Sequence, residues 1–453
     1  MRTNTLPAIA LAIFAVIPVA ACGAGAPDSD AASQKIAAHD RSQDLSAFRD
    51  SFFEIDSSYN ADARAEAEAR LSALQTEAGQ LSDAAFELRL SEIVALADNG
   101  HTLLFSGPWR EKFNRIPVKF IIFDGRLYIG ETDEAHEDLK GLEVVRIGSH
   151  SWRETRRALG RYQGGLDQWK LNFIQNFIES PEVLHAAGLI DSADRVTLTV
   201  VNDGREKTVS FEAGAIPSSL QGFERFIPPA RLVEFIRSDS DSEEDLPLYL
   251  QNAADLYRLE WLDGDIAYIQ FKANAGESNG EDARAFSRRA ATALSARTPS
   301  HVILDQRFNS GGDLNNTRDL MQALPGLVAE GGKVYVITSG KTFSAGISSV
   351  GYLKQAGGDR VAIVGEPVGD RLEFWAEGDV TRLPQSGAML LYATERHNYM
   401  TGCPEDDCHG SIKTHPIAVE SLQPDYPTPL THDEFMSGRD PAMEKIMALI
   451  KSE

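Results

Sequence analysis

The chain has 453 residues, more than one ordinary hydrophobic core organises, so its length predicts two or three domains. Hydrophobic residues make up 42% of the chain and charged residues 25%, a balance typical of folded globular proteins. The formal net charge of -23 gives a surface that repels nucleic acid and anionic lipid headgroups. We therefore expect no nucleic-acid partner, whereas a polypeptide remains an open partner class.

The first 22 residues have the pattern of an export signal. Arg2 precedes an apolar stretch at residues 6–21, which is short for a membrane span and contains prolines. The stretch ends in Val-Ala-Ala-Cys22, which resembles the bacterial lipobox, whose cysteine is lipidated. We expect residues 1–22 to be a lipoprotein signal peptide, Cys22 a lipid anchor, and residues 23–41 a flexible tether. An ordinary signal peptide with an incidental cysteine is the alternative. The expected location is the cell envelope, on the periplasmic side of a membrane in a Gram-negative cell.

Four further segments follow the tether. Residues 42–112 space their apolar positions as helices do and predict a helical domain, while residues 113–215 are β-rich. Residues 216–250 contain a run of acidic and serine residues and predict a linker. In residues 251–453, strands and helices alternate, which predicts an α/β core with largely parallel strands. The expected strands are 266–271, 301–305, 333–337 and 360–364, and the expected helices are 282–296, 317–324 and 345–356.

Two of these strands end in sequences suited to chemistry. After the strand at 301–305, Gly311 and Gly312 leave the backbone uncovered, so their N–H groups can form an oxyanion hole. After the strand at 333–337, Ser344 stands where a loop turns into a helix, and the N–H of Ala345 offers a further oxyanion donor. Ser344 is a candidate nucleophile. From spacing alone, a simple helix N-cap is the favoured interpretation of Ser344.

The segments ILDQRFNSGGD, YVITSGKTFSAG and IVGEPVGD together resemble the carboxy-terminal-processing and tricorn-core family of serine peptidases. The resemblance extends over most of the chain. It implies a crotonase-like (ClpP/crotonase-type) α/β peptidase core, with an N-terminal helical domain and a PDZ-like domain at residues 113–215. It also implies that Ser344 is the nucleophile. The segment Ala-Asp-Asn-Gly-His101-Thr resembles the one that carries the catalytic histidine in the family's His-dependent branch.

The general base is predicted to be His101. The family's other branch uses a lysine about 25 residues after the serine, but no lysine lies between Lys354 and Lys413. Arg371, near that place, does not deprotonate at a workable pH. A histidine base needs a third group to orient it. We expect Glu377 in that role, by similarity to related bacterial proteins, and the alternatives are Glu366 and Glu420.

Cys403 and Cys408 are the cysteines that remain if Cys22 is acylated. They flank a turn-like sequence, and an exported chain meets an oxidising environment, so a local disulfide is expected. A metal site that includes nearby His409 is the competing interpretation.

These inferences predict an exported serine peptidase that hydrolyses peptide bonds through an acyl-enzyme on Ser344 and needs no metal or organic cofactor. Its partners would be a polypeptide substrate and, through the lipid anchor, a membrane. The PDZ-like segment would capture an extended peptide by strand addition. The alternatives are a catalytically silent ligand- or peptide-binding envelope lipoprotein, an esterase that uses the same residues, and an envelope scaffold.

Overall fold

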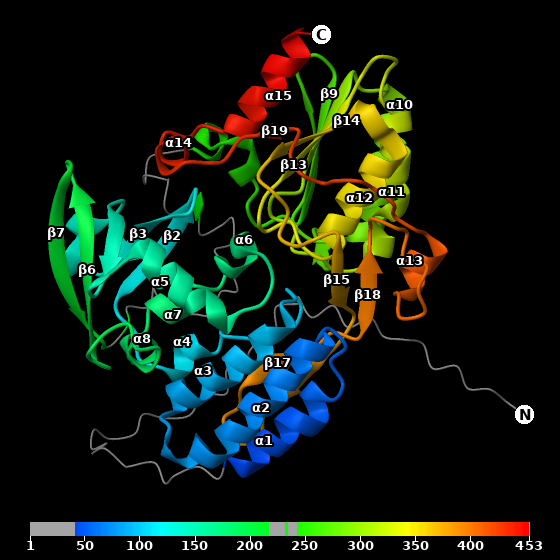
Figure 1. The fold of residues 1–453 in the computed structure, drawn as a ribbon. Coiled ribbons are helices and arrows are strands. Elements are labelled where there is room, and N and C mark those ends of the chain that lie inside the picture. Colours follow the sequence, from blue (N-terminus) through cyan, green and yellow to red (C-terminus); the bar gives the residue numbers. More distant parts are fainter. Residues whose placement is uncertain (1–40, 215, 217–231, 234–241, 453) are drawn as a thin grey trace, which may run out of the picture.

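The computed structural model describes residues 41–452, except 215, 217–231 and 234–241 (Figure 1). The expected signal peptide, Cys22 and nearly all of the tether lie outside the described residues, as does most of the expected linker. Among the described helices, none combines the length and the apolar character needed to cross a bilayer.

A six-stranded sheet forms the centre of the C-terminal half. Its order is β19-β14-β13-β12-β9-β8, and every neighbouring pair is parallel except β8 with β9. The strands are β8 (Tyr257–Leu262), β9 (Ile266–Phe271), β12 (His301–Asp305), β13 (Val334–Thr338), β14 (Val361–Gly365) and β19 (Tyr426–Pro427). Because β12, β13 and β14 run parallel, the loops after them meet at one edge of the sheet.

Helices cover both faces of this sheet (Figure 1). One face packs against α10 (Ala283–Arg297), α11 (Arg318–Ala323) and α12 (Ala345–Gly357). The other face packs against α15 (Pro441–Ser452). Successive strand residues alternate between the two cores, which is why the strands read as continuous apolar runs. All strands and helices expected in this half are present, with ends that differ by one residue or two.

The N-terminal part is helical, as its periodicity predicts. It contains α1 (Ser42–Phe48), a π-helical turn (Arg49–Phe53), α2 (Ala61–Glu77) and α3 (Asp83–Val94). Its unexpected feature is a three-stranded sheet, in the order β1-β17-β16. Strand β1 (Leu103–Leu104) pairs with β17 (Met389–Leu391), which pairs with β16 (Val380–Arg382). A hairpin from the end of the chain therefore completes the N-terminal part.

An antiparallel sheet, β2-β3-β4-β6-β7, organises the β-rich segment. Short helices pack beside it (Figure 1). The strands are β2 (Val118–Phe123), β3 (Arg126–Thr132), β4 (Glu143–Ile147), β6 (Arg195–Asn202) and β7 (Arg205–Glu212), of which β7 was not expected from the sequence. The helices are α4 (Trp109–Lys112), α5 (Trp152–Leu159), α6 (Asp167–Lys170), α7 (Gln175–Ile178) and α8 (Pro181–Ala186).

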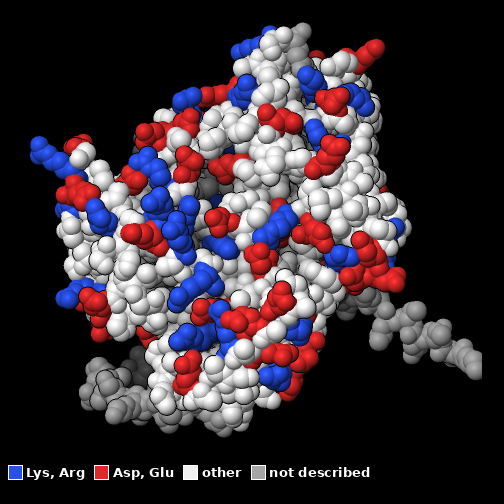
Figure 2. Space-filling view, in the orientation of Figure 1, with Lys and Arg blue, Asp and Glu red and all other residues white. Residues whose placement is uncertain are grey.

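Acidic and basic side chains are interspersed on the face of the molecule that Figure 2 shows. The formal net charge of -23 is therefore not gathered into a single acidic patch on that face.

A buried ion-pair cluster joins the helical part to the β-rich part. The carboxylate of Glu179 lies 2.6 Å from the guanidinium of Arg110 and 2.9 Å from that of Arg115, and all three side chains are at most 5% exposed. A substitution that removes one partner of such a cluster leaves buried charge uncompensated.

We expect Glu179→Gln to lower the free energy of unfolding by about 3–5 kcal/mol, because the buried guanidinium of Arg110 loses the carboxylate 2.6 Å from it. Chemical denaturation measures this loss. The matched control is Glu111→Gln, at an exposed position of α4. A loss for Glu179→Gln no larger than that of the control would contradict the prediction.

Candidate active site

Ser344 stands at a sharp turn between β13 and α12. Its backbone dihedrals are φ 52° and ψ -126°, a conformation that a residue with a side chain rarely adopts. Although Ser344 is the N-cap residue of α12, its side chain makes no capping hydrogen bond. The side chain is half-buried. A strained serine between a strand and a helix is the arrangement that exposes a nucleophilic hydroxyl. The side-chain hydrogen bond that a simple N-cap serine would make is therefore absent.

The paired glycines lie against this serine. Gly311 and Gly312 have φ values of +110° and +131°, which favour glycine. A Cβ on Gly311 would lie 3.1 Å from Oγ of Ser344 and 3.2 Å from the backbone N of Ala345. The missing side chain thus leaves room beside the hydroxyl, where a substrate oxygen would sit.

The three predicted oxyanion donors are not equivalent. The N–H of Gly311 donates to Oδ1 of Asn309 at 3.1 Å. The N–H groups of Gly312 and Ala345 donate no hydrogen bond to any residue within the described part of the chain. Gly312 and Ala345 are therefore the better candidates for binding a developing oxyanion.

A buried amide network fixes these loops relative to each other. The Asn274 side chain donates to the carbonyl of Ala345 at 2.9 Å, and its Oδ1 accepts from Asn309 at 2.7 Å. The carbonyl of Asn309 accepts from the N–H of Phe343 at 2.9 Å. The last bond ties the glycine loop directly to the loop that carries Ser344, and Asn274 bridges the same two loops, so the oxyanion donors and the hydroxyl keep their relative positions.

His101 reaches the core because the two residues before it dock there. The Asn99 side chain donates to the carbonyl of Trp375 at 3.0 Å and accepts from the N–H of the same residue at 3.1 Å. A Cβ on Gly100 would lie 2.8 Å from Oδ2 of Asp370 and 2.8 Å from the Phe343 ring, so no side chain fits there. Arg371 anchors the same turn through an ion pair with Asp98 at 2.7 Å.

The imidazole of His101 lies between two aromatic rings. Its centroid is 4.3 Å from that of Phe343, the residue directly before Ser344, and 5.3 Å from that of Phe374 on β15 (Glu373–Ala376). Trp169 stacks on the far side of Phe343, with centroids 3.5 Å apart. The ring of His101, from the helical part, thus packs against the residue that directly precedes Ser344 in the α/β core.

Asp370 is the carboxylate that the structure pairs with His101. Its Oδ2 lies 3.9 Å from Nδ1 of His101, and its side chain is only 1% exposed. Burial raises the pKa of Asp370 to about 7, although the N–H and the charge of Arg371 oppose the rise. An acid in this position can orient the imidazole and stabilise its cationic form.

The three glutamates expected as candidates for the third residue lie elsewhere. Glu377 is 3.3 Å from Nε2 of His397 and interacts with His101 only through longer-range charge. Glu366 is held by the N–H of Leu430 at 3.3 Å, and Glu420 is exposed.

Cys403 and Cys408 are joined by a disulfide in the structure. The loop between them lies along β18 (Glu395–Asn398), where the N–H of Arg396 donates to the carbonyl of Asp407 at 2.9 Å. Both sulfurs are therefore engaged with each other, so the competing metal site on these cysteines has no thiolate to offer.

Sequence reasoning missed several residues of this site. Asp370 stands in a Gly-Asp-Arg stretch, and nothing in the sequence around it shows that its carboxylate is buried. Asn274 and Phe374 carry no pattern that separates them from ordinary strand-end and core residues. Their roles depend on contacts between loops that are distant in the chain.

The raised pKa of Asp370 makes its contribution to stability depend on pH. Between about pH 4 and pH 7 the unfolded chain has lost a proton that the folded chain still holds, so stability falls as the pH rises through this range. Asp370→Asn removes that titration. Its free energy of unfolding, relative to the wild type, should rise by about 4 kcal/mol from pH 4 to pH 8.

Denaturation at a series of pH values measures this difference. Asp379→Asn, at an exposed position, serves as the control and should stay parallel to the wild type. A curve for Asp370→Asn that is also parallel to the wild type would show that the folded chain does not retain this proton.

Comparisons with known proteins show that this chain is similar in fold to solved structures. No protein-family model and no curated sequence matches the chain. Among solved structures it resembles mature CPAF complexed with lactacystin, with a TM-score of 0.50 and 10% identity, over 86% of this chain and 91% of that chain. It also resembles the photosystem II D1 C-terminal processing protease, with a TM-score of 0.37 and 12% identity, over 89% of this chain and 98% of that chain. The match to CPAF shows that the two chains share an α/β fold at very low sequence identity.

Proposed function

We propose that this protein is an exported serine peptidase that cleaves polypeptides through an acyl-enzyme on Ser344. The observation that carries the proposal is the turn at Ser344, whose hydroxyl is not used for capping and faces the space left by Gly311. A second supporting observation is that the ring of His101, the proposed general base, stacks on the residue that precedes the serine. The sequence resemblance to carboxy-terminal-processing peptidases supports the same reaction.

In the proposed mechanism, His101 takes the proton of Ser344 as the hydroxyl attacks a peptide carbonyl. The N–H groups of Gly312 and Ala345 bind the oxyanion that forms. His101 then gives its proton to the leaving amine, and water hydrolyses the acyl-enzyme by the same steps. In this mechanism the ring comes into hydrogen-bond reach of the serine when substrate binds.

We assign Asp370 as the positioning residue for His101. The separation of 3.9 Å between Asp370 and the ring supports this role, and so does the burial of the carboxylate beside Gly100. Once His101 becomes cationic, the adjacent carboxylate favours that charge. Glu377, the residue expected from the family resemblance, is paired with a different histidine.

A cavity of about 370 Å³ offers space for a ligand, and its lining includes none of Ser344, His101 and Asp370. It lies between β2 of the β-rich sheet and the loop at residues 339–341 that leads to Ser344. We propose that the β-rich segment is a PDZ-like module and that a peptide extends through this cavity towards the serine, held in part by main-chain hydrogen bonds.

Ser344→Ala should abolish labelling by a fluorophosphonate probe and lower kcat/KM for unfolded protein substrates by about 10⁴-fold or more, because no other group replaces the nucleophile. The matched control is Ser295→Ala, on the exposed face of α10. His101→Gln should lose most activity as well, whereas His185→Gln, at an exposed position, should keep it.

Peptides, unfolded proteins and short-chain esters should be assayed together. Cleavage of peptides with loss in Ser344→Ala supports the peptidase, and turnover of esters alone would identify an esterase. Failure of the wild type to react with the probe or any substrate would overturn the proposal in favour of a binding protein.

We further propose that Cys22 anchors the protein to a membrane of the cell envelope through lipid. The lipobox-like sequence before this cysteine supports the proposal. In cells fed a labelled fatty acid, the wild type should carry the label and partition with membranes, and Cys22→Ser should do neither. Cys403→Ser controls for the loss of another cysteine. Equal labelling of wild type and Cys22→Ser would contradict the lipid anchor.

A further inference from the structure

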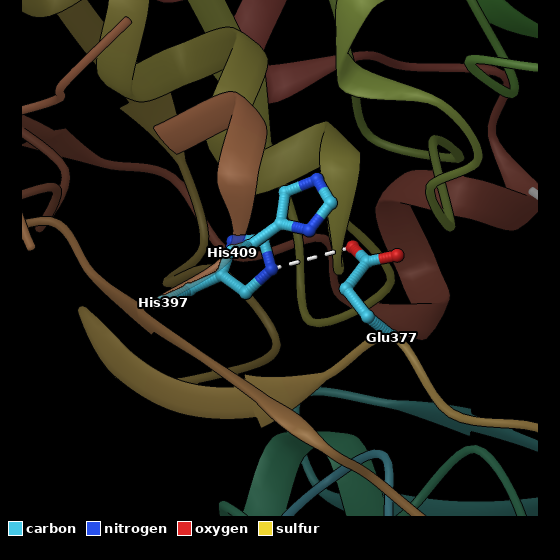
Figure 3. A group of neighbouring side chains, drawn as sticks. All are labelled: Glu377, His397 and His409. Carbon is cyan, nitrogen blue, oxygen red and sulfur yellow. Dashed lines mark ion pairs between the residues drawn. The ribbon is translucent and has the colours of Figure 1, made fainter. Parts of the chain in front are cut away.

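Three side chains that the mechanism does not use converge beside the candidate active site. Glu377 follows β15, His397 belongs to β18, and His409 directly precedes α13 (Gly410–Thr414). One potential ligand atom from each residue lies within 4.8 Å of the other two. Figure 3 shows the two imidazole rings stacked, with the carboxylate of Glu377 directed towards them.

The imidazole of His397 is buried with one nitrogen left for a ligand. Its Nδ1 is 2.9 Å from the hydroxyl of Tyr399, which is in turn 2.6 Å from Oγ of Ser348. Its Nε2 lies 3.3 Å from the carboxylate of Glu377, its ion-pair partner, but makes no hydrogen bond to any described residue, although the side chain is only 3% exposed. A buried ring nitrogen that makes no hydrogen bond is costly unless a ligand binds it. In metal sites, one nitrogen of a histidine ligand binds the metal and the other is usually held by a neighbouring protein group.

His409 is held in place from two directions. The disulfide of Cys403 and Cys408 ends one residue before it, and its own N–H donates to the carbonyl of Arg396 at 2.9 Å. The carboxylate of Glu395 lies 2.6 Å from Nδ1 of its ring. The backbone and a carboxylate therefore fix this imidazole before any ligand arrives, which lowers the cost of binding one.

We propose that Glu377, His397 and His409 bind one divalent transition-metal ion of the Zn²⁺ class. Two imidazoles and one carboxylate are a common ligand set for Zn²⁺. Zn–N and Zn–O bonds of about 2.0–2.1 Å in a tetrahedral site place neighbouring ligand atoms about 3.3–3.4 Å apart. The separation of 3.3 Å between His397 and Glu377 matches that spacing. The side chain of Glu377 is 38% exposed, which gives an ion access from solvent.

The ring of Phe374 lies between the proposed metal site and the candidate base, His101. Phe374 stacks on His397 with centroids 5.0 Å apart, and its ring also stacks on His101 at 5.3 Å. An ion on His397 would hold that imidazole, and with it the ring against which His101 packs. The proposal concerns binding and does not depend on the chemistry assigned to Ser344.

The test uses the purified full-length protein, stripped of metal by chelator and then titrated with Zn²⁺ in a calorimeter. We expect about one Zn²⁺ per chain, a Tm that rises with Zn²⁺ concentration, and visible d–d absorption when Co²⁺ is used instead. Glu377→Gln and His409→Gln, both at sites that are not fully buried, should each weaken binding by more than the roughly 10–100-fold that loss of an outer partner causes. Glu395→Gln should weaken binding within roughly 10–100-fold.

Two control variants match the ligand substitutions. Glu373 begins β15, the strand that Glu377 follows, but its carboxylate accepts a hydrogen bond from Arg396, so Glu373→Gln removes a nearby carboxylate that is not a proposed ligand. The second control, His185→Gln, removes an exposed histidine. Both should bind Zn²⁺ as the wild type does. The proposal is overturned if the wild type binds no Zn²⁺, or if Glu377→Gln and His409→Gln bind it as tightly as these controls. Circular dichroism verifies that each variant is folded.

Discussion

The insertion of residues 99–101 into the α/β core is the constraint on which the site depends. Asn99 pairs with the backbone of β15 as a strand would, and Gly100 has no side chain because a carboxylate and a phenylalanine ring occupy that space. His101 is then clamped between Phe343 and Phe374. Buried hydrogen bonds, close packing and ring stacking act on three successive residues, so the imidazole has little freedom to leave the serine's neighbourhood.

Much of this architecture could be read from the amino-acid order. Continuous apolar runs such as Ile266–Phe271 identify strands that are buried on both faces, and their alternation with helices fixes the class of fold. Gly311 and Ser344 could be singled out because each stands in the loop that follows such a strand, where parallel sheets place their ligands. These signals depend only on residues that are near one another in the chain, so a single sequence is enough to recognise them.

What could not be read depends on contacts between distant segments. Nothing near Asp370 marks it as buried, since its environment is made by Gly100 and by aromatic rings from other elements. Strand β17 is too short for its sequence to predict a strand, and its pairing with Leu103–Leu104 joins segments that are far apart in the chain. The stacked rings of Phe374, His397 and His409 likewise assemble only when the hairpin and the disulfide loop fold together.

The pairing of β1 with β17 also dictates when the protein becomes complete. The N-terminal helices are synthesised first, but their small sheet lacks its partner strands until the last quarter of the chain follows. His101 sits two residues from β1 and packs on a phenylalanine from the same late region, so its surroundings are finished at the same moment. A chain whose synthesis has not yet reached Phe374 and β17 therefore cannot enclose His101.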